Sequence, residues 1–477
     1  MGPRPSVLLH RGERLQGQFR RDQHDSGPDR GNEELEDGVN LRLPSGKLLD
    51  WGNTDFDVNL VVWDAVFDLG GQLFFDIFDV EGMLGDLPIV NGSYAPYFNV
   101  LPRKYRFRIL NASMSRFWKM ALSAGGRAVP FQFIANDGNL ITNPLTLSEL
   151  EPQGMGERFD IVVDFSRFRI GEKIHMVNLA QHRDGRRMKE EFSLKKALKG
   201  DDKDPVVGAF MEFRVVGEVE SVDVPGVIHR AGQPDVSRVP AKLTEPIPIV
   251  APVRTRHVEF KKSGGDSRGS DGKCIPDCPE HASFPWTIRI NGEDHHSFNA
   301  NRISMIIPQS GDVEHWTYEN GGGGWDHPIH LHFEEGVTMK RDKLKQTTEP
   351  PNTRKDVWRL GEGGSVTFQV QFGEFGGSYV NHCHNTVHED FAMLARIQLL
   401  TGVPGSPQRA ITPTPNPTED GVFFSTPEII PEGVPREMRQ QVRQMQQQVQ
   451  NDDRRGRRKG RRERRRPDLS SLLRDDA

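Results

Sequence analysis

The chain has 477 residues, of which 35% are hydrophobic and 27% charged, and its formal net charge at pH 7 is −5. This length exceeds the usual size of a single domain and predicts two packed domains with tails. The sequence has no run of about 18 apolar residues, which excludes a transmembrane helix of ordinary length. Its first residues lack the apolar stretch of a readable signal peptide.

Residues 41–216 carry the pattern of β-strands. Apolar side chains alternate with other residues over 105–109 and 159–165, which is the period of a half-buried strand. Three Xaa-Gly pairs predict turns, and the first and third are candidate hairpins. They are Asn91-Gly92, Asp137-Gly138 and Asn291-Gly292. The pattern predicts an all-β fold of Greek-key β-sandwiches.

The two histidines of this first domain, His175 and His182, lack the spacing of metal ligands, so we expect the domain to bind no metal. Further along, Cys274 and Cys278 lie in a polar loop from Lys261 to Ser283. They would form a disulfide in an oxidising compartment or stay as two thiols in a reducing one. A zinc site with His281 is a third reading, although it lacks an obvious fourth ligand.

Two runs of the second domain concentrate metal-binding side chains. Residues 327–332 read His-Pro-Ile-His-Leu-His, and residues 382–393 contain three histidines, a cysteine and a methionine. A thiolate, imidazoles and a weak thioether are the ligands of an electron-transfer copper site. In a strand, residues i and i+2 share one face, so His382 and His384 should point away from Cys383 toward a second site.

The end of the chain changes in character. Pro404 to Pro435 is rich in proline, and Arg436 to Gln450 is rich in glutamine with the spacing of a weakly amphipathic helix. Arg454 to Arg466 then holds ten basic residues in thirteen. Residues 403–477 are expected to be largely disordered. The basic block would contact anionic surfaces through charge alone, and no specific nucleic acid is expected.

The two histidine-rich runs resemble the C-terminal copper signature of multicopper oxidases, H-P-x-H-x-H followed by H-C-H-x3-H-x4-M, at every ligand position. Within that family, Trp325 and the pair Glu389-Asp390 resemble the bilirubin oxidase and spore-coat laccase branch. The stretch from Pro102 to Ser113 also resembles the family, and the likeness extends roughly from Leu41 to Thr401.

The resemblance implies tandem cupredoxin-like domains, a copper-free one at 41–216 and a copper-binding one at 217–402. It implies that Cys383, His327 and His388 bind a type 1 copper, with Met393 as the axial ligand. It further implies that His330 binds a type 2 copper, that His332, His382 and His384 bind the type 3 pair, and that Glu389 helps to deliver protons.

The resemblance also implies that the oxygen-reducing cluster is only half-liganded in this chain. In the family, two H-x-H pairs of an N-terminal domain complete that cluster, and no other histidine pair here has this spacing. We therefore expect that the first cupredoxin domain is absent and that residues 1–40 are a mostly disordered linker remnant.

The resulting prediction is a laccase-like, copper-dependent oxidoreductase. It would take single electrons from a small-molecule or metal-ion donor through an exposed type 1 imidazole and pass them to O2. The alternatives are a non-catalytic electron-transfer cupredoxin and an inactive truncated paralogue. The family and the disulfide reading point to a periplasmic or extracellular location.

Overall fold

A computed structural model describes most of the chain between residues 56 and 410. The described residues are 56–76, 79, 81–220, 228–229, 231–232, 239–262, 286–292, 304–307, 311–343, 348–350, 352–373, 377–391, 393–401 and 409–410. The predictions for residues 1–40, for Cys274, Cys278 and His281, and for the tail beyond residue 410 fall outside this part of the chain.

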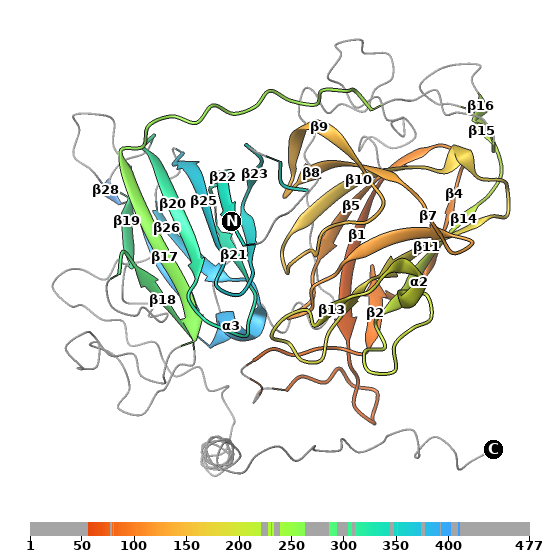
Figure 1. Ribbon diagram of the computed structural model, residues 1–477, viewed down its shortest axis with the longest axis horizontal. Coiled ribbons are helices and arrows are strands. Elements are labelled where there is room, and N and C mark those ends of the chain that lie inside the picture. Colours follow the sequence, from red (N-terminus) through yellow and green to blue (C-terminus); the bar gives the residue numbers. More distant parts are fainter. Residues whose placement is uncertain are drawn as a thin grey trace. The chain divides into compact units, whose positions relative to one another are not determined.

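The first half of the described chain forms a β-sandwich of two sheets (Figure 1). The seven-stranded sheet has the order β3-β2-β1-β5-β10-β8-β9. Its strands are β1 (Asp57–Ala65), β2 (Leu87–Val90), β3 (Ser93–Tyr94), β5 (Lys104–Asn111), β8 (Phe131–Asn136), β9 (Asn139–Leu147) and β10 (Arg158–Asp164). The five-stranded sheet β4-β14-β11-β6-β7 consists of β4 (Tyr97–Val100), β6 (Met120–Ala124), β7 (Arg127–Ala128), β11 (Lys173–Asn178) and β14 (Gly208–Val215).

Short elements fill the connections of this first sandwich. They are η1 (Phe165–Arg167), the paired strands β12 (Ala180–Gln181) and β13 (Glu190–Glu191), α2 (Leu194–Ala197), and the paired strands β15 (Val219–Glu220) and β16 (Ile228–His229).

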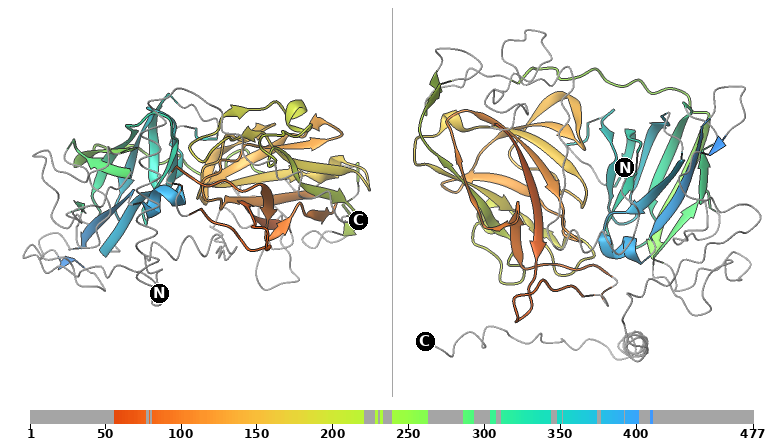
Figure 2. Two further views of the ribbon diagram at one scale, coloured as in Figure 1. Left: turned by 90° about the horizontal axis from the view of Figure 1, so that it is seen from below. Right: turned by 180° about the vertical axis from the view of Figure 1, so that it is seen from behind.

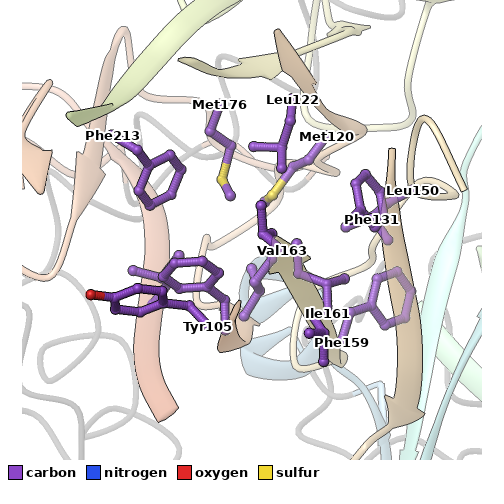
Figure 3. Packing of buried hydrophobic residues seen from close by; sticks show 14 of the residues in the cluster. Tyr105, Met120, Leu122, Phe131, Leu150, Phe159, Ile161, Val163, Met176 and Phe213 are labelled. Carbon is purple, nitrogen blue, oxygen red and sulfur yellow. The ribbon is translucent and has the colours of Figure 1, made fainter. Parts of the chain in front are cut away.

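Aromatic and sulfur-containing side chains from both sheets form the core of the first sandwich (Figure 3). Phe107 of β5 lies 5.1 Å from Phe213 of β14 between ring centroids, which joins the two sheets directly. Met120 and Met176 pack into the same core from the five-stranded sheet. Each such fully buried side chain contributes roughly 1.5–3 kcal/mol to folding.

Strands β5 and β10 lie where the alternating pattern predicts them, but the prediction that they are half-buried is wrong. Their polar faces are buried too: Arg106 binds Asp160 at 2.7 Å and Arg108 binds Asp57 at 2.6 Å, with all four side chains largely hidden from solvent. Charge-assisted hydrogen bonds offset part of the cost of taking these groups out of water. The sequence pattern shows polarity but not the partner that makes burial tolerable.

The Xaa-Gly turns also differ from prediction in one respect. Asn91-Gly92 closes the β2–β3 hairpin as expected, and Asp137-Gly138 closes a β8–β9 hairpin that had been predicted only as a turn. Both pairs have positive φ at each residue, as a type I′ turn requires. Asn291-Gly292 has the same backbone, but the residues that follow it lie outside the described part.

The second half forms another two-sheet sandwich, with a core of its own (Figure 2). One sheet, β18-β17-β20-β25-β22-β23, has the strands β17 (Arg254–Lys262), β18 (Trp286–Ile290), β20 (Val313–Asn320), β22 (Gly336–Asp342), β23 (Arg354–Lys355) and β25 (Ser365–Gln371). The other, β19-β27-β26-β21-β24, has β19 (Met305–Ile307), β21 (His327–Leu331), β24 (Val357–Leu360), β26 (Gly377–Cys383) and β27 (Leu394–Thr401), with β28 (Arg409–Ala410) paired to β27. A one-turn helix, α3 (Thr386–Asp390), connects β26 to β27.

The prediction of an all-β fold with tandem sandwiches is confirmed by this architecture. Among the helices in the described part of the chain, none is long and apolar enough to cross a membrane.

Candidate metal centre

Two neighbouring strands bring the two histidine-rich runs together. β21 pairs antiparallel with β26, in a register that places Ile329 opposite Cys383 and His330 opposite His382. Because alternate residues of a strand face opposite sides, this register sends two sets of side chains to two different places. One set gathers around Cys383 and the other around His382.

A short helix after β26 returns a third side chain to Cys383. The Asn385 side chain caps α3 by accepting a hydrogen bond from the Val387 amide at 3.2 Å, and the turn that follows carries His388. The chain then re-enters the sheet at Met393, whose carbonyl accepts a hydrogen bond from the Cys383 amide at 3.1 Å. Met393 is fully buried in the same core cluster as Cys383.

Three ligand atoms form a compact triangle in this first site. Cys383 Sγ lies 3.4 Å from His327 Nδ1 and 3.6 Å from His388 Nδ1, and the two nitrogens are 3.1 Å apart. The centre of such a triangle is about 2 Å from each atom, close to the metal–nitrogen and metal–sulfur bond lengths of protein sites. The residues therefore fit a metal ion without rearrangement.

The buried environment keeps both imidazoles of the first site neutral. Burial lowers the pKa of His327 to about 3 and holds the pKa of His388 well below its ordinary value. The same burial raises the pKa of the Cys383 thiol well above its ordinary value. The nitrogens therefore keep their lone pairs at neutral pH, whereas a metal ion must displace the thiol proton when it binds.

The second site is a group of four imidazoles on the other face of the same strands. Ligand atoms of His330, His332 and His382 lie within 4.8 Å of one another. The His384 ring is 5.2 Å from the His382 ring and 5.6 Å from the His330 ring between centroids. His382 is buried, whereas the other three side chains are half-buried.

Hydrogen bonds orient two of these rings. His330 Nδ1 lies 3.0 Å from the carbonyl oxygen of Asp356, and His382 Nδ1 lies 3.1 Å from the carbonyl oxygen of Cys383, with Glu389 Oε2 as an ion-pair partner at 3.2 Å. These contacts leave Nε2 for a metal ion, and His382 Nε2 has no hydrogen-bond partner among the described residues. A buried, unpartnered ring nitrogen beside other imidazoles is the chemistry of a metal ligand.

Comparison with known proteins identifies the family to which the chain is related. The multicopper oxidase family model matches residues 277–401, which include both sites. The bilirubin oxidase of Albifimbria verrucaria is 30% identical over 362 residues, covering 74% of this chain and 54% of that protein. This chain belongs to the multicopper oxidase family. A laccase of Bacillus subtilis (strain 168) is 27% identical over 381 residues, covering 74% of this chain and 64% of the laccase.

Solved multicopper oxidases share the fold. The McoA 2F4 variant from Aquifex aeolicus matches with a TM-score of 0.53 at 24% identity, covering 72% of this chain and 66% of that chain. A laccase from Pediococcus acidilactici matches with the same TM-score of 0.53 at 23% identity, covering 75% and 62%. This chain spans between half and two thirds of the length of the two curated relatives named above. Copper is the metal of this family, and the donor atoms of the first site suit it.

The first sandwich reaches the second site through contacts that the sequence did not reveal. A Cβ added to Gly156 would lie 2.3 Å from His384 Cδ2, so only glycine lets this imidazole approach. Arg158 holds Asp356 through two hydrogen bonds of 2.6 and 2.7 Å, and Asp356 in turn bonds His330. Gly156 was visible in the sequence only as one of 48 glycines.

Two tryptophans lie against the first site. The Trp286 ring is 3.8 Å from the His388 ring between centroids, and Trp325 meets Trp286 edge-on at 5.4 Å. Trp325 was singled out from the sequence, whereas Trp286 was missed because nothing in its spacing relates it to the ligands. His327 and His388 are 1% and 0% exposed, so the prediction of an exposed type 1 imidazole is wrong.

Proposed function

We propose that this chain binds a blue type 1 copper through Cys383, His327 and His388, with Met393 as the weak axial ligand, and accepts single electrons there. The observation that carries the proposal is the triangle of one sulfur and two nitrogens, with sides of 3.1, 3.4 and 3.6 Å, inside an apolar core. A soft thiolate with two imidazoles and a distant thioether is the ligand set of electron-transfer copper.

We further infer that His330 contributes to a type 2 copper and that His332, His382 and His384 contribute to a type 3 pair. When bound, copper at the two sites supplies one-electron acceptance and oxygen reduction, respectively. Cys383 stands between His382 and His384 in the chain, so two covalent backbone paths join the sites. Additional imidazoles, of the kind that completes this cluster in the family, are needed for full oxygen chemistry.

Glu389 is the acid we assign to proton delivery. Its Oε2 atom lies 3.2 Å from His382 Nδ1, and its side chain is 7% exposed. The carboxyl group can therefore hold a proton in direct contact with His382, one of the ligands of the second site, while bulk water is largely excluded. Its contact with Nδ1 acts together with the hydrogen bond between that nitrogen and the Cys383 carbonyl oxygen, and both leave Nε2 of His382 to face the cluster.

The whole protein would thus be a laccase-like oxidase, with a small-molecule or metal ion as electron donor and O2 as acceptor. The relatives named bilirubin oxidase and laccase support this reaction class for the complete protein. The periplasmic or extracellular location expected of the family is part of the same proposal.

Copper content and colour test the proposal. The copper-loaded protein should show an intense absorption band at about 600 nm, which arises from thiolate bound to copper. Cys383→Ser and His388→Gln should each abolish the band. His175→Gln is the matched control, because that histidine is half-exposed and lies in the first sandwich, where its Nε2 atom is 3.2 Å from Glu212 Oε2.

Stoichiometry separates the oxidase from its rival. A copper content near one per chain, with full colour, would indicate an electron carrier whose second site stays empty, whereas a larger content that falls on His330→Gln would support the cluster. A band that survives Cys383→Ser would contradict the type 1 assignment.

A further inference from the structure

We propose that the type 1 site of this chain is a sealed electron port, in which donors pass electrons without touching the His388 imidazole. The inference rests on the proposed function of the first site. The seal consists of Glu81, Gly82 and Gly185 from the copper-free sandwich together with Trp286, and we call these four residues the cover.

The first part of the cover uses the outer edge of His388. His388 Nε2 lies 3.1 Å from the backbone carbonyl oxygen of Glu81, while Nδ1 faces Cys383 Sγ at 3.6 Å. A carbonyl oxygen only accepts, so this contact, which is shorter than the 3.3 Å approach of Asn385 Nδ2 to the same atom, places the proton on Nε2 and leaves the lone pair of Nδ1 for the metal. The Nε2–H group that a donor would approach is therefore already engaged.

The second part is a close crossing of two loops of the copper-free sandwich. A Cβ on Gly185 would lie 2.2 Å from the Gly82 carbonyl carbon, and a Cβ on Gly82 would lie 2.5 Å from the Gly185 carbonyl oxygen. The Gly185 oxygen also accepts a hydrogen bond from Asn385 Nδ2 at 3.3 Å. Only two glycines allow backbones to cross this closely, and the crossing holds the Glu81 carbonyl over His388.

The second loop is anchored beside the other imidazole. The Asp326 amide, next to His327, donates a hydrogen bond to the Arg186 carbonyl at 3.0 Å. The Arg186 side chain forms an ion pair with Glu81, which ties this loop to the first one. The cover is therefore held to the copper-binding sandwich at more than one point.

The last part is Trp286, which lies over the ring of His388. Its centroid is 3.8 Å from the imidazole centroid at an angle of 35°, and its side chain is 0% exposed. The half-buried Trp325 meets Trp286 edge-on at 5.4 Å, with Lys262 4.5 Å and Arg186 5.1 Å from its ring centroid. A donor that docks at Trp325 thus has a path to His388 through the indole of Trp286.

This geometry selects the kind of donor. One electron crosses the indole to the metal site, the donor is oxidised by one electron, and any proton that the donor loses goes to solvent, because His388 Nε2 keeps its own. Rigid one-electron donors, such as metal complexes and planar aromatics, satisfy this requirement. Phenols that must bond to the imidazole edge as they are oxidised do not.

The exchange of the His388 Nε2–H proton tests the seal directly. In the reduced, copper-loaded protein, nitrogen-15 NMR should show this proton exchanging at least about tenfold more slowly than an imidazole proton of the half-exposed His175, because exchange requires local opening. Gly185→Ala should force the loops apart and speed the exchange by about tenfold or more. Gly70→Ala is the control, since its Cβ meets only the tip of the Asp68 carboxylate, at 3.2 Å.

Reduction of the blue band gives a second readout. Gly185→Ala should raise the rate with catechol several-fold and leave the rate with ferrocyanide within about twofold, because only catechol gains from contact with the imidazole. Fast exchange in the unaltered protein would overturn the seal, and so would equal rates for catechol in the Gly185→Ala and Gly70→Ala proteins. If Gly185→Ala does not fold, exchange in the unaltered protein decides alone. Absence of the blue band would instead refute the proposed function.

Discussion

The two sandwiches share one architecture, and a buried ion pair of the first contrasts with the buried metal-ligand cluster of the second. In the first sandwich, the buried Arg116 side chain binds Asp64 at 2.8 Å and Asp204 at 2.9 Å, so its charge is compensated. In the other sandwich, Cys383, His327 and His388 are equally buried, but they face one another with no counter-charge among them. Buried charges of opposite sign that pair with one another keep the cost of burial low. Buried groups that all offer lone pairs form a potential metal site instead.

The largest expected effect comes from breaking a compensated pair. Asp64→Asn would remove the charge that holds Arg116 Nε and would weaken the bond from the Gly85 amide to Asp64 Oδ2. Removing one partner of a buried ion pair typically costs about 3–5 kcal/mol of the free energy of unfolding. Urea unfolding of the metal-free protein measures this. A loss below about 1 kcal/mol would mean that Asp204 alone compensates the guanidinium.

The next effect concerns the glycine through which the first sandwich contacts the second site. Gly156→Ala would place a methyl group 2.3 Å from His384 and strain a backbone with φ of +81°. We expect about 1–3 kcal/mol of destabilisation and copper binding at the second site weakened about 10–100-fold. Gly171→Ala, with φ of +87° and no atom near the added Cβ, carries the backbone strain alone. Equal effects of the two substitutions would refute the contact with His384.

A smaller effect should appear as a dependence on pH. Burial first, then the charges of Arg116 and Arg359, hold the pKa of His182 well below its ordinary value of 6.5. The folded protein keeps this imidazole neutral, whereas the unfolded chain binds a proton below that pH. The contribution of His182 to the free energy of unfolding is therefore fully present above pH 6.5. It decreases as the pH falls toward the pKa of the folded state, at up to roughly 1.4 kcal/mol per pH unit.

His182→Gln should remove this share of the slope. Unfolding of the metal-free protein at pH 7 and pH 5 measures the slope with and without the histidine. A slope that is unchanged or steeper in the variant would contradict the assignment. The slope that remains should belong to the second sandwich, where burial likewise lowers the pKa values of His327, His330 and His388.

The smallest effect on stability should follow removal of an uncompensated group. His327→Leu replaces a buried, neutral imidazole in an apolar core by a hydrocarbon of similar size. The metal-free protein should change by less than about 1.5 kcal/mol, in either direction, because no buried charge loses its partner. Colour should nevertheless be lost completely. A loss of stability as large as that of Asp64→Asn would end the contrast between the two sandwiches.

The sequence by itself determined the strands, the ligand types and their division between two sites. Alternation along β5 and β10 predicts strands, and the spacing of His382, Cys383 and His384 sends neighbouring ligands to opposite faces. These features follow from local backbone geometry, which a short stretch of residues sets on its own. They could therefore be predicted without any knowledge of what packs nearby.

Only the tertiary structure decided what surrounds the ligands. Glu81 and His388 are 307 positions apart, yet their hydrogen bond closes the edge that was expected to be exposed. Arg158 and Asp356, 198 positions apart, orient His330 in the same way. No periodicity encodes such contacts, because they depend on how two sandwiches, each with a core of its own, pack against one another. Side-chain spacing gives the metal site its chemistry, and long-range packing decides which molecules reach it.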